Sequence, residues 1–399
     1  MPPPVETRLA RLLDRRDIAS ENCTLMGEYW YRPGEVLVHR DDLPMVEKEL
    51  RRWGGRQCGL PDKLRYLRER DFPVVRFELE PRMSVDAVVS RLRQVTDGPE
   101  PRVAPNHVVG AWQSPGFMPA DLPVPAKDPV KLKSAEPCAF TVAVIDSGLV
   151  QDGKAADFVN EAGARLVAAA DGDDRVDVSP TDGMLDDADG HGTFIAGIVL
   201  REAPSATVRM TAVLDDDWVA DDLEVANAIL ANADADVINL SLGGYARNDV
   251  PPVSIVEAIN SLPATTVVVA AAGNYAMRRP MFPAALKRVI AVAAVDETPE
   301  AQMVDGLPPI SDFSGHGWWV DACASGTKVL SNYLTFTESD GTEYTGWATW
   351  SGTSFATPKV AGRIAALAIG SGRPANQVAF ELLYASGLPW RPDLGVYVG

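Results

Sequence analysis

The chain has 399 residues, of which 46% are hydrophobic and 23% are charged, and it carries a formal net charge of −18. This length is enough for two or three domains with sizeable cores. The acidic balance argues against a nucleic-acid partner, because binding to phosphate requires a basic face that displaces counterions.

The N-terminal segment carries charges throughout and has no apolar core of signal-peptide length. No stretch is long and apolar enough to predict a membrane span. We therefore expect a cytoplasmic protein without a membrane partner. The cysteines show no metal-type spacing and no disulfide framework, so we expect free buried thiols at Cys23, Cys58, Cys138 and Cys323.

Residues 1–110 are predicted to form a small α+β region. Strands or extended pieces are expected at Gly34–Arg40, Phe72–Leu79 and Pro101–Val109, and helices at Met45–Trp53 and Ser84–Val95. Ser84 is the expected cap of the second helix. Residues 111–137 are rich in proline, which predicts a linker or a connection that lies along the surface.

Residues 138–399 have a different character, because short runs of Val, Ile and Ala alternate with helical stretches. Strands that are apolar at nearly every position are covered on both faces, as in a parallel α/β sheet. The runs are FTVAVID, VRMTAVL, DVINLSL, TTVVVAAAG and VIAVAAV. The fold class expected is α/β, with a mostly parallel sheet flanked by helices and preceded by the small α+β region.

Polar residues stand where these runs end, at the sheet edge where functional groups gather in α/β proteins. Asp146 ends the first run, and Asn274 follows TTVVVAAAG. His191 opens a helix-like stretch, and Ser354 stands at the start of an apolar helix. Each of these residues alone is more often a turn former, a helix cap or a packing residue.

Together these four residues supply the parts of an acyl-transfer site. A Ser hydroxyl needs a base to take its proton, and imidazole suits this role at neutral pH. A carboxylate must orient the imidazole, and hydrogen-bond donors must stabilise the oxyanion. The start of a helix behind Ser354 adds a favourable dipole for that negative charge.

The order Asp146, His191, Ser354, with the motifs DSG, HGT, GN and GTS-x-A-x-P, resembles the subtilisin-like serine proteases over about Ala139–Ser371. The resemblance implies that Ser354 attacks, His191 transfers the proton and Asp146 orients His191. It implies an oxyanion hole formed by Asn274 and the Ser354 N–H, with no cofactor. It also implies that the substrate is a polypeptide, bound by Ser241, Leu242, Gly243, Gly244, Ala272 and Gly273.

Three positions depart from the family pattern. Phe194 stands where the family often has a second His, and Lys359 stands where His is common. Only seven residues, YAMRRPM, lie between Asn274 and Phe282, so Arg278 or Arg279 is a candidate to line the substrate pocket and to favour an acidic residue at the cut.

Two further sites follow from clustered carboxylates. We hypothesise that five aspartates attract a Lys or Arg of the substrate that lies a few residues before the cut: Asp215, Asp216, Asp217, Asp221 and Asp222. The alternative is that they form a solvated loop followed by a helix N-terminus, which favours Asp. A Ca²⁺ site is an open hypothesis for Asp171–Gly190, although the EF-hand pattern fails because Val176 occupies its glycine position. No metal ligand is assigned.

The first region resembles a subtilisin-type pro-domain, with APNHVV as its last strand. This predicts an intramolecular inhibitor, as in a zymogen, with self-cleavage within Gly110–Pro137. The alternative is a permanently attached regulatory domain. His107 is expected to be a packing or surface residue. The function expected is that of a serine endopeptidase; the alternatives are a peptide-maturation protease or macrocyclase that uses the same site, and an inactive binding scaffold.

Overall fold

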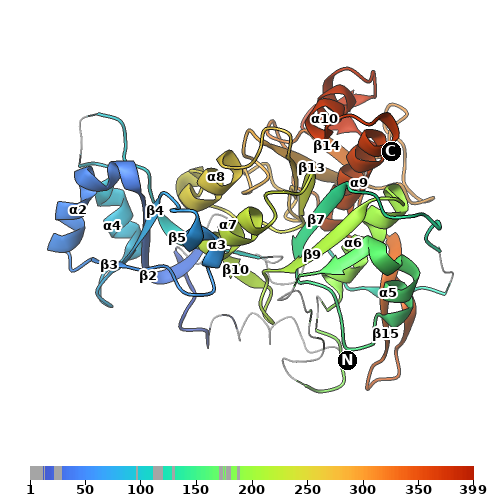
Figure 1. The fold of residues 1–399 in the computed structure, drawn as a ribbon, viewed down its shortest axis with the longest axis horizontal. Coiled ribbons are helices and arrows are strands. Elements are labelled where there is room, and N and C mark those ends of the chain that lie inside the picture. The colour runs from blue at the N-terminus through green and yellow to red at the C-terminus, as the bar shows by residue number, and fades with distance from the viewer. Residues whose placement is uncertain are drawn as a thin grey trace.

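Two regions lie side by side in the computed structural model, the smaller one formed by the first 110 residues (Figure 1). The structure describes residues 12, 14–21, 29–95, 98–110, 120–127, 131–169, 174, 176, 181–186 and 189–399.

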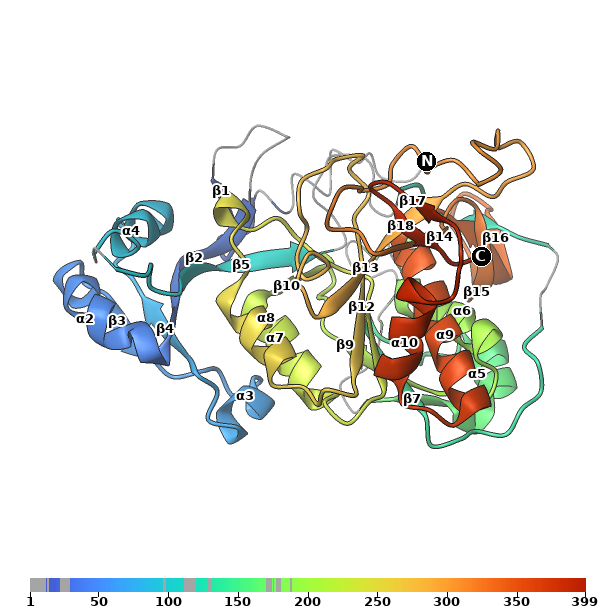
Figure 2. The same ribbon diagram turned by 90° about the horizontal axis from the view of Figure 1, so that it is seen from above.

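The larger region is built on a sheet with the strand order β17-β18-β14-β13-β12-β11-β7-β9-β8. All neighbouring strands pair in parallel except β17 and β18. Helices α6 and α9 lie on one side of the sheet, and α7 and α8 lie on the other (Figures 1 and 2). Burial on both faces explains why the central strands are apolar throughout. The predicted α/β fold class is therefore confirmed.

The described strands of this sheet are β7 (Thr141–Asp146), β8 (Leu166–Ala168), β9 (Thr207–Ala212), β11 (Val237–Leu240), β12 (Val267–Ala271), β13 (Val289–Val295), β14 (Ala322–Ser325), β17 (Trp390–Arg391) and β18 (Gly395–Tyr397). The helices of the region are α5 (Ala156–Ala162), α6 (His191–Glu202), α7 (Asp222–Ala231), α8 (Val253–Asn260), α9 (Thr353–Ser371) and α10 (Ala375–Tyr384). All five apolar runs that the sequence singled out contain a strand of this sheet.

The smaller region has an antiparallel sheet covered by helices α2 and α4 (Figure 1). Its elements are β1 (Ala19–Glu21), β2 (Tyr29–His39), α2 (Leu43–Arg52), β3 (Arg56–Cys58), α3 (Arg65–Glu69), β4 (Val74–Glu78), α4 (Val85–Leu92) and β5 (Val103–Gly110). Ser84 caps α4 as predicted, since its hydroxyl accepts a hydrogen bond from the Ala87 N–H at 3.2 Å. Strand β2 begins earlier than predicted, and β3 and α3 were not predicted.

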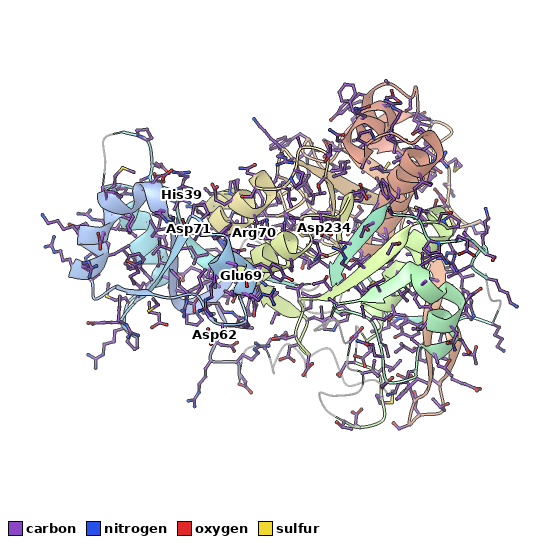
Figure 3. All side chains as sticks on the ribbon, in the orientation of Figure 1. His39, Asp62, Glu69, Arg70, Asp71 and Asp234 are labelled. Atoms are coloured by element: carbon purple, nitrogen blue, oxygen red, sulfur yellow. The ribbon has the colours of Figure 1, made fainter. Side chains whose placement is uncertain are left out.

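The smaller region has its own core, which includes Val36, Phe77 and Leu92. A second set of its apolar side chains, among them Leu64 and Leu67, belongs instead to the core of the larger region. Figure 3 shows His39 at the junction of the two regions, where its Nε2 lies 3.6 Å from the Glu257 carboxylate of α8. The two regions are therefore packed together.

The sheet of the smaller region continues into the larger one. Strand β10 (Val219–Asp221) pairs antiparallel with β5 and completes the order β10-β5-β2-β4-β3. This pairing places β5 along the edge of the larger region, as both views show (Figures 1 and 2).

Part of the proline-rich segment lies on the surface of the larger region. Strand β6 (Val124–Pro125) pairs with β16 (Glu343–Trp350), which forms a hairpin with β15 (Val329–Thr337). The Asp121 carboxylate accepts hydrogen bonds from the Ser351 N–H at 2.8 Å and from its hydroxyl at 2.6 Å. A connection along the surface was expected; residues 111–119 and 128–130 lie outside the described residues.

Within the described ranges, every helix is too short or too polar to cross a bilayer. Cys323 is a free buried thiol as expected, whereas Cys58 and Cys138 are free but only partly buried, which corrects the prediction. Cys23 lies outside the described residues.

Candidate active site

Asp146 and His191 form a buried pair at the carboxyl end of the sheet. The Asp146 Oδ1 atom lies 2.7 Å from His191 Nδ1, and both side chains are fully buried. Asp146 is the last residue of β7, and His191 is the first residue of α6. The carboxylate can therefore hold the ring with its Nε2 atom facing away. Nε2 has no hydrogen-bond partner among the described residues.

The residues beside this pair hold the strand end and the helix start together. A Cβ atom on Gly192 would collide with the carbonyl oxygen of Gly148, so only glycine fits between the two motifs. The Ser147 hydroxyl accepts a hydrogen bond from the Gly192 N–H at 3.0 Å and donates one to Asp174 at 2.8 Å. The DSG and HGT motifs are thus held together by the close approach of Gly192 to Gly148 and by the hydrogen bond from Gly192 to Ser147.

Aromatic rings surround His191. Its ring centroid lies 5.1 Å from that of Trp218, 5.3 Å from that of Phe355 and 5.5 Å from that of Trp350. Trp218 has a φ of 65°, a left-handed conformation that costs a bulky residue about 1–3 kcal/mol and often marks a functional position. Phe194 packs against Phe355 at 4.6 Å, so the ring that replaces the family's second His joins this cluster.

Ser354 lies in the first turn of α9, next to Phe355. Its hydroxyl donates a hydrogen bond of 3.3 Å to the Ser241 carbonyl, and the Ser241 hydroxyl donates one of 2.9 Å to the Ser354 carbonyl. Because α9 begins at Thr353, Ser354 is not the cap of this helix. Its N–H is one of the first-turn donors that have no acceptor within a helix.

Asn274 is oriented by Thr353. Its Oδ1 atom accepts hydrogen bonds from the N–H and the hydroxyl of Thr353, each at 2.8 Å. The amide nitrogen Nδ2 is buried and has no partner among the described residues. A buried amide donor without an acceptor is costly, and it is available to an oxygen atom that a ligand brings.

The predicted substrate-binding segments lie beside Ser354. Gly243 exchanges two backbone hydrogen bonds with Gly110 at the end of β5, and Gly244 exchanges two with Phe282. Gly273 donates its N–H to the Thr353 hydroxyl at 3.1 Å. Ser241, Leu242 and Ala272 are also buried here.

The structure corrects the suggestion that an arginine lines the pocket. Arg278 pairs with Asp393 at 2.8 Å, and Arg279 pairs with Asp249 at 2.6 Å. Both guanidinium groups are thereby held by acidic partners. Met281 takes the place beside Gly243 and Gly273, and sequence reasoning missed it because its position depends on the path of the preceding loop.

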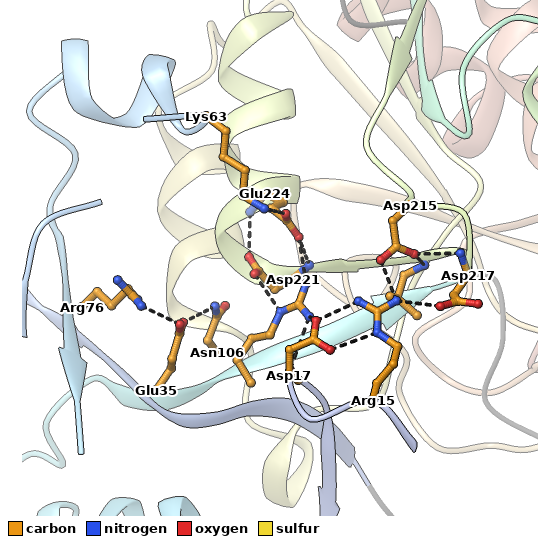
Figure 4. Close-up of polar contacts among 12 residues, drawn as sticks. Arg15, Asp17, Glu35, Lys63, Arg76, Asn106, Asp215, Asp217, Asp221 and Glu224 are labelled. Atoms are coloured by element: carbon orange, nitrogen blue, oxygen red, sulfur yellow. Dashed lines mark hydrogen bonds and ion pairs between the residues drawn. The ribbon is translucent and has the colours of Figure 1, made fainter. Parts of the chain in front are cut away.

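The acidic segment 215–222 faces basic side chains of the smaller region (Figure 4). Arg15 pairs with Asp215 at 2.7 Å and with Asp217 at 3.0 Å. Arg32 pairs with Asp221 at 3.0 Å and with Glu224 at 3.3 Å. Lys63 also pairs with Glu224.

Asp221 and Asp222 are buried, whereas Asp215 and Asp216 are exposed. Asp221 caps α7 through a capping box with Glu224, and burial raises the pKa of Asp221 to about 7 although Arg32 opposes the shift. Asp222 accepts hydrogen bonds from the His107 N–H at 3.0 Å and lies 2.7 Å from His107 Nδ1. His107 Nε2 accepts a hydrogen bond from the Arg247 backbone N–H at 3.1 Å. Both ring nitrogens of this buried residue therefore have polar partners within the protein.

The described residues include no group of three or more His, Cys, Asp or Glu side chains placed to hold a metal ion. Much of Asp171–Gly190 lies outside the described residues. Lys359 is half-buried, and desolvation lowers the pKa of its amine.

Comparisons with known proteins identify the family of the larger region. The profile of the subtilase family matches residues 139–375. The chain is 35% identical over 215 residues to thermitase from Thermoactinomyces vulgaris. This alignment covers 51% of this chain and 69% of thermitase. The chain is 37% identical over 200 residues to a thermophilic serine proteinase from Bacillus sp. strain AK1, which covers 47% of this chain and 44% of that protein. The match thus spans less than half of the second relative.

Among solved structures, the fold is similar to that of fervidolysin from Fervidobacterium pennivorans, a keratinolytic enzyme related to subtilisin. The TM-score is 0.59 at 20% identity, with 92% of this chain and 60% of fervidolysin covered. A lanthipeptide protease is similar with a TM-score of 0.50 at 24% identity, over 65% of this chain and 85% of that one. At these identities the two structures show a shared fold.

Proposed function

This chain belongs to the subtilase family of subtilisin-like serine endopeptidases, and we propose that it hydrolyses peptide bonds with Asp146, His191 and Ser354 as its catalytic residues. The observation that carries the proposal is the fully buried Asp146–His191 pair at 2.7 Å. A carboxylate in this position fixes the tautomer of the ring and stabilises the imidazolium. No organic cofactor takes part.

The reaction begins at Ser354. Its Oγ atom attacks the carbonyl carbon of the scissile peptide bond while His191 Nε2 takes the hydroxyl proton. The resulting oxyanion accepts hydrogen bonds from Asn274 Nδ2 and from the Ser354 N–H. Support for this role of Asn274 comes from its buried amide nitrogen, which has no partner among the described residues.

The tetrahedral intermediate then collapses. The C–N bond breaks, and the amine leaves with the proton that His191 returns to it, so that an acyl ester remains on Ser354. A water molecule attacks this ester while His191 again acts as base. Release of the carboxylic acid restores the Ser354 hydroxyl.

The smaller region acts as an intramolecular inhibitor in this proposal. Strand β5 is hydrogen-bonded on one side to β10 and, through Gly110, to Gly243 on the other. A peptide substrate that adds a strand to these same edges would need the space that β5 occupies. The charge contacts of Arg15, Arg32 and Lys63 support a docked state, and self-cleavage within Gly110–Pro137 would release it.

A fluorophosphonate probe tests the proposal on the full chain. We expect one probe adduct on the wild type, measured by intact mass, and none on Ser354→Ala. Loss of an N-terminal fragment that ends within residues 110–137, in the wild type only, would support self-cleavage. Labelling without fragmentation would instead favour a permanently attached regulatory domain.

Absence of labelling in both proteins, together with no peptidase activity, would contradict the enzyme and favour the binding scaffold. A product joined head to tail, in place of a hydrolysed peptide, would favour the macrocyclase. Mass spectrometry of the same incubations distinguishes these outcomes.

A further inference from the structure

The substrate residue that precedes the scissile bond has a defined place for its side chain, beside the segments 241–243 and 271–273. The Ser354 hydroxyl donates to the Ser241 carbonyl at 3.3 Å, so the reacting carbonyl lies close to Ser241. Asn274, which directly follows Gly273, marks the opposite side. The pairing of Gly110 with Gly243 shows that an extended chain runs along the first segment. The side chain in question would therefore enter between residues 241–243 and 271–273.

This space is filled by the Met281 side chain. A Cβ atom on Gly243 would lie 2.6 Å from Met281 Cε, and one on Gly273 would lie 2.5 Å from Met281 Sδ. The thioether therefore touches both walls at the positions where neither has a side chain. Met281 is only 2% exposed, which leaves little free volume around it.

The backbone of Met281 is fixed on both sides. Phe282 exchanges hydrogen bonds of 2.8 Å and 2.9 Å with Gly244, and the Met281 carbonyl accepts the Ala285 N–H at 2.8 Å. A shift of the whole segment would break these bonds, so the pocket could deepen only by rotation of the Met281 side chain.

The opposite wall cannot retreat either. Gly315 donates its N–H to the Gly273 carbonyl at 2.7 Å. A Cβ atom on Gly315 would collide with the carbonyl of Ala272, so this backbone packs directly behind the wall. Extra volume forced into such a closely packed site is destabilising.

No cation reaches this space from the described neighbours, because Arg278 and Arg279 are held by Asp393 and Asp249. The Arg279 guanidinium also lies 4.4 Å from the centre of the Tyr245 ring. Tyr275, whose ring lies 5.4 Å from that of Tyr245, is half-buried beside Gly273. The pocket is therefore apolar as well as short.

We propose that Met281 restricts the residue before the cut to small side chains such as those of Gly and Ala. The inference rests on the proposed function and deepens it by naming a substrate class. Large side chains such as Phe and Leu are excluded because they would occupy the volume of the thioether.

Peptides that differ only in the residue before the cut test the inference. Every measurement uses the full chain with the background substitution Gly110→Pro. This substitution removes the N–H that donates to the Gly243 carbonyl and thereby loosens β5. We expect kcat/KM to be at least tenfold higher for Gly and Ala than for Phe and Leu. Met281→Ala should raise kcat/KM at least tenfold for Phe and Leu and change it little for Gly and Ala. Changes of this size are typical when a hydrophobic pocket gains or loses a few carbon atoms.

Two conservative variants separate specificity from folding. Met281→Leu keeps the volume and should keep the wild-type preference, and Met281→Val should lie between the wild type and Met281→Ala. Met303→Ala removes an exposed methionine and should leave the preference unchanged. Melting curves identify a variant that fails to fold, in which case Met281→Val carries the comparison.

Equal kcat/KM for cleavage after Phe and after Ala by the Gly110→Pro chain, with Met281 in place, would overturn the inference. So would an unchanged preference in a folded Met281→Ala or Met281→Val. Labelling of Ser354 by fluorophosphonate without any cleavage of the Gly and Ala peptides also contradicts it. Absence of labelling contradicts the proposed function instead, which keeps the two failures apart.

Discussion

Gly110 and Gly243 exchange two backbone hydrogen bonds, with N···O distances of 3.1 Å and 3.3 Å. One residue ends a strand of the smaller region, and the other belongs to a segment that adjoins Ser354. Val219 pairs with Gly110 from the other side. The last residue of β5 is thus held between two segments of the larger region, and in the proposed function a peptide substrate would add its strand at this same place.

The pairing of Arg32 with Asp221 and Glu224 stabilises this arrangement. These contacts are part-buried, and their loss leaves Asp221 and Glu224 without the Arg32 charge. We expect Arg32→Ala to loosen the smaller region and to raise the rate of Ser354 labelling by fluorophosphonate at least tenfold. The rate is measured by intact mass at a series of times.

Arg56→Ala is the matched control, since Arg56 pairs with Glu78 on the exposed face of the same region. Exposed ion pairs contribute little to stability, so the labelling rate should not change. An equal rise in both variants would show that Arg32 does not act through its contact with the larger region.

The pH dependence of stability should contain a component from Asp221. Burial raises the pKa of this carboxyl to about 7 in the folded chain, against 3.8 for an ordinary Asp. Between these values the folded chain holds more protons than the unfolded chain, so this contribution to the free energy of unfolding falls as the pH rises and levels off above about 7.

Asp221→Asn cannot titrate and should lack this component. We therefore expect the melting temperature of the wild type, relative to that of the variant, to decrease between pH 5 and pH 8. A difference that stays constant or grows over this range would contradict the assignment. Asp71→Asn is a suitable control because Asp71 is fully exposed.

Removal of the Asn274 amide should lower kcat far more than it changes KM. Loss of one oxyanion donor typically lowers kcat by about 10²–10³-fold. We expect this loss for Asn274→Ala, with substrate binding little changed. Thr353→Val removes only the hydroxyl that orients the amide and leaves the Thr353 N–H in place, so the loss should be smaller. Steady-state kinetics on a Gly or Ala peptide gives both parameters, and a change in KM alone would contradict this role.

Gly192→Ala should impair the site without removing any functional group. Its new methyl group would collide with the Gly148 carbonyl and push α6 away from β7. Overpacking of this kind costs about 1–3 kcal/mol. We expect a lower melting temperature and a loss of activity, because the Asp146–His191 distance depends on this contact. Gly370→Ala, in an open part of α9, is the control and should have little effect.

Much of the larger region could be predicted because its signals are local. The boundaries of β13 match the run VIAVAAV at both ends, since all positions of this central strand except Ile290 are buried. Asp146 and His191 were placed correctly at a strand end and a helix start because each motif stands next to its own apolar run.

The contacts between distant segments could not be predicted in the same way. Arg15 meets Asp215 from 200 positions away, and no pattern near either residue indicates the pair. The pairing of β6 with β16 is likewise invisible in the short stretch Val124–Pro125. Met281 lies against Gly243 and Gly273, and no pattern in the short loop before it predicts this contact.

The covalent link between β5 and the larger region has a kinetic consequence. A tethered strand has an effective concentration at its binding place that is set by the length of its link, often in the millimolar range, and that does not change when the protein is diluted. In the proposed inhibition by β5, a soluble peptide must compete with this fixed value as long as the backbone between residues 110 and 138 is intact. A single cut there turns the same contact into a bimolecular equilibrium, which dilution shifts toward the separated regions.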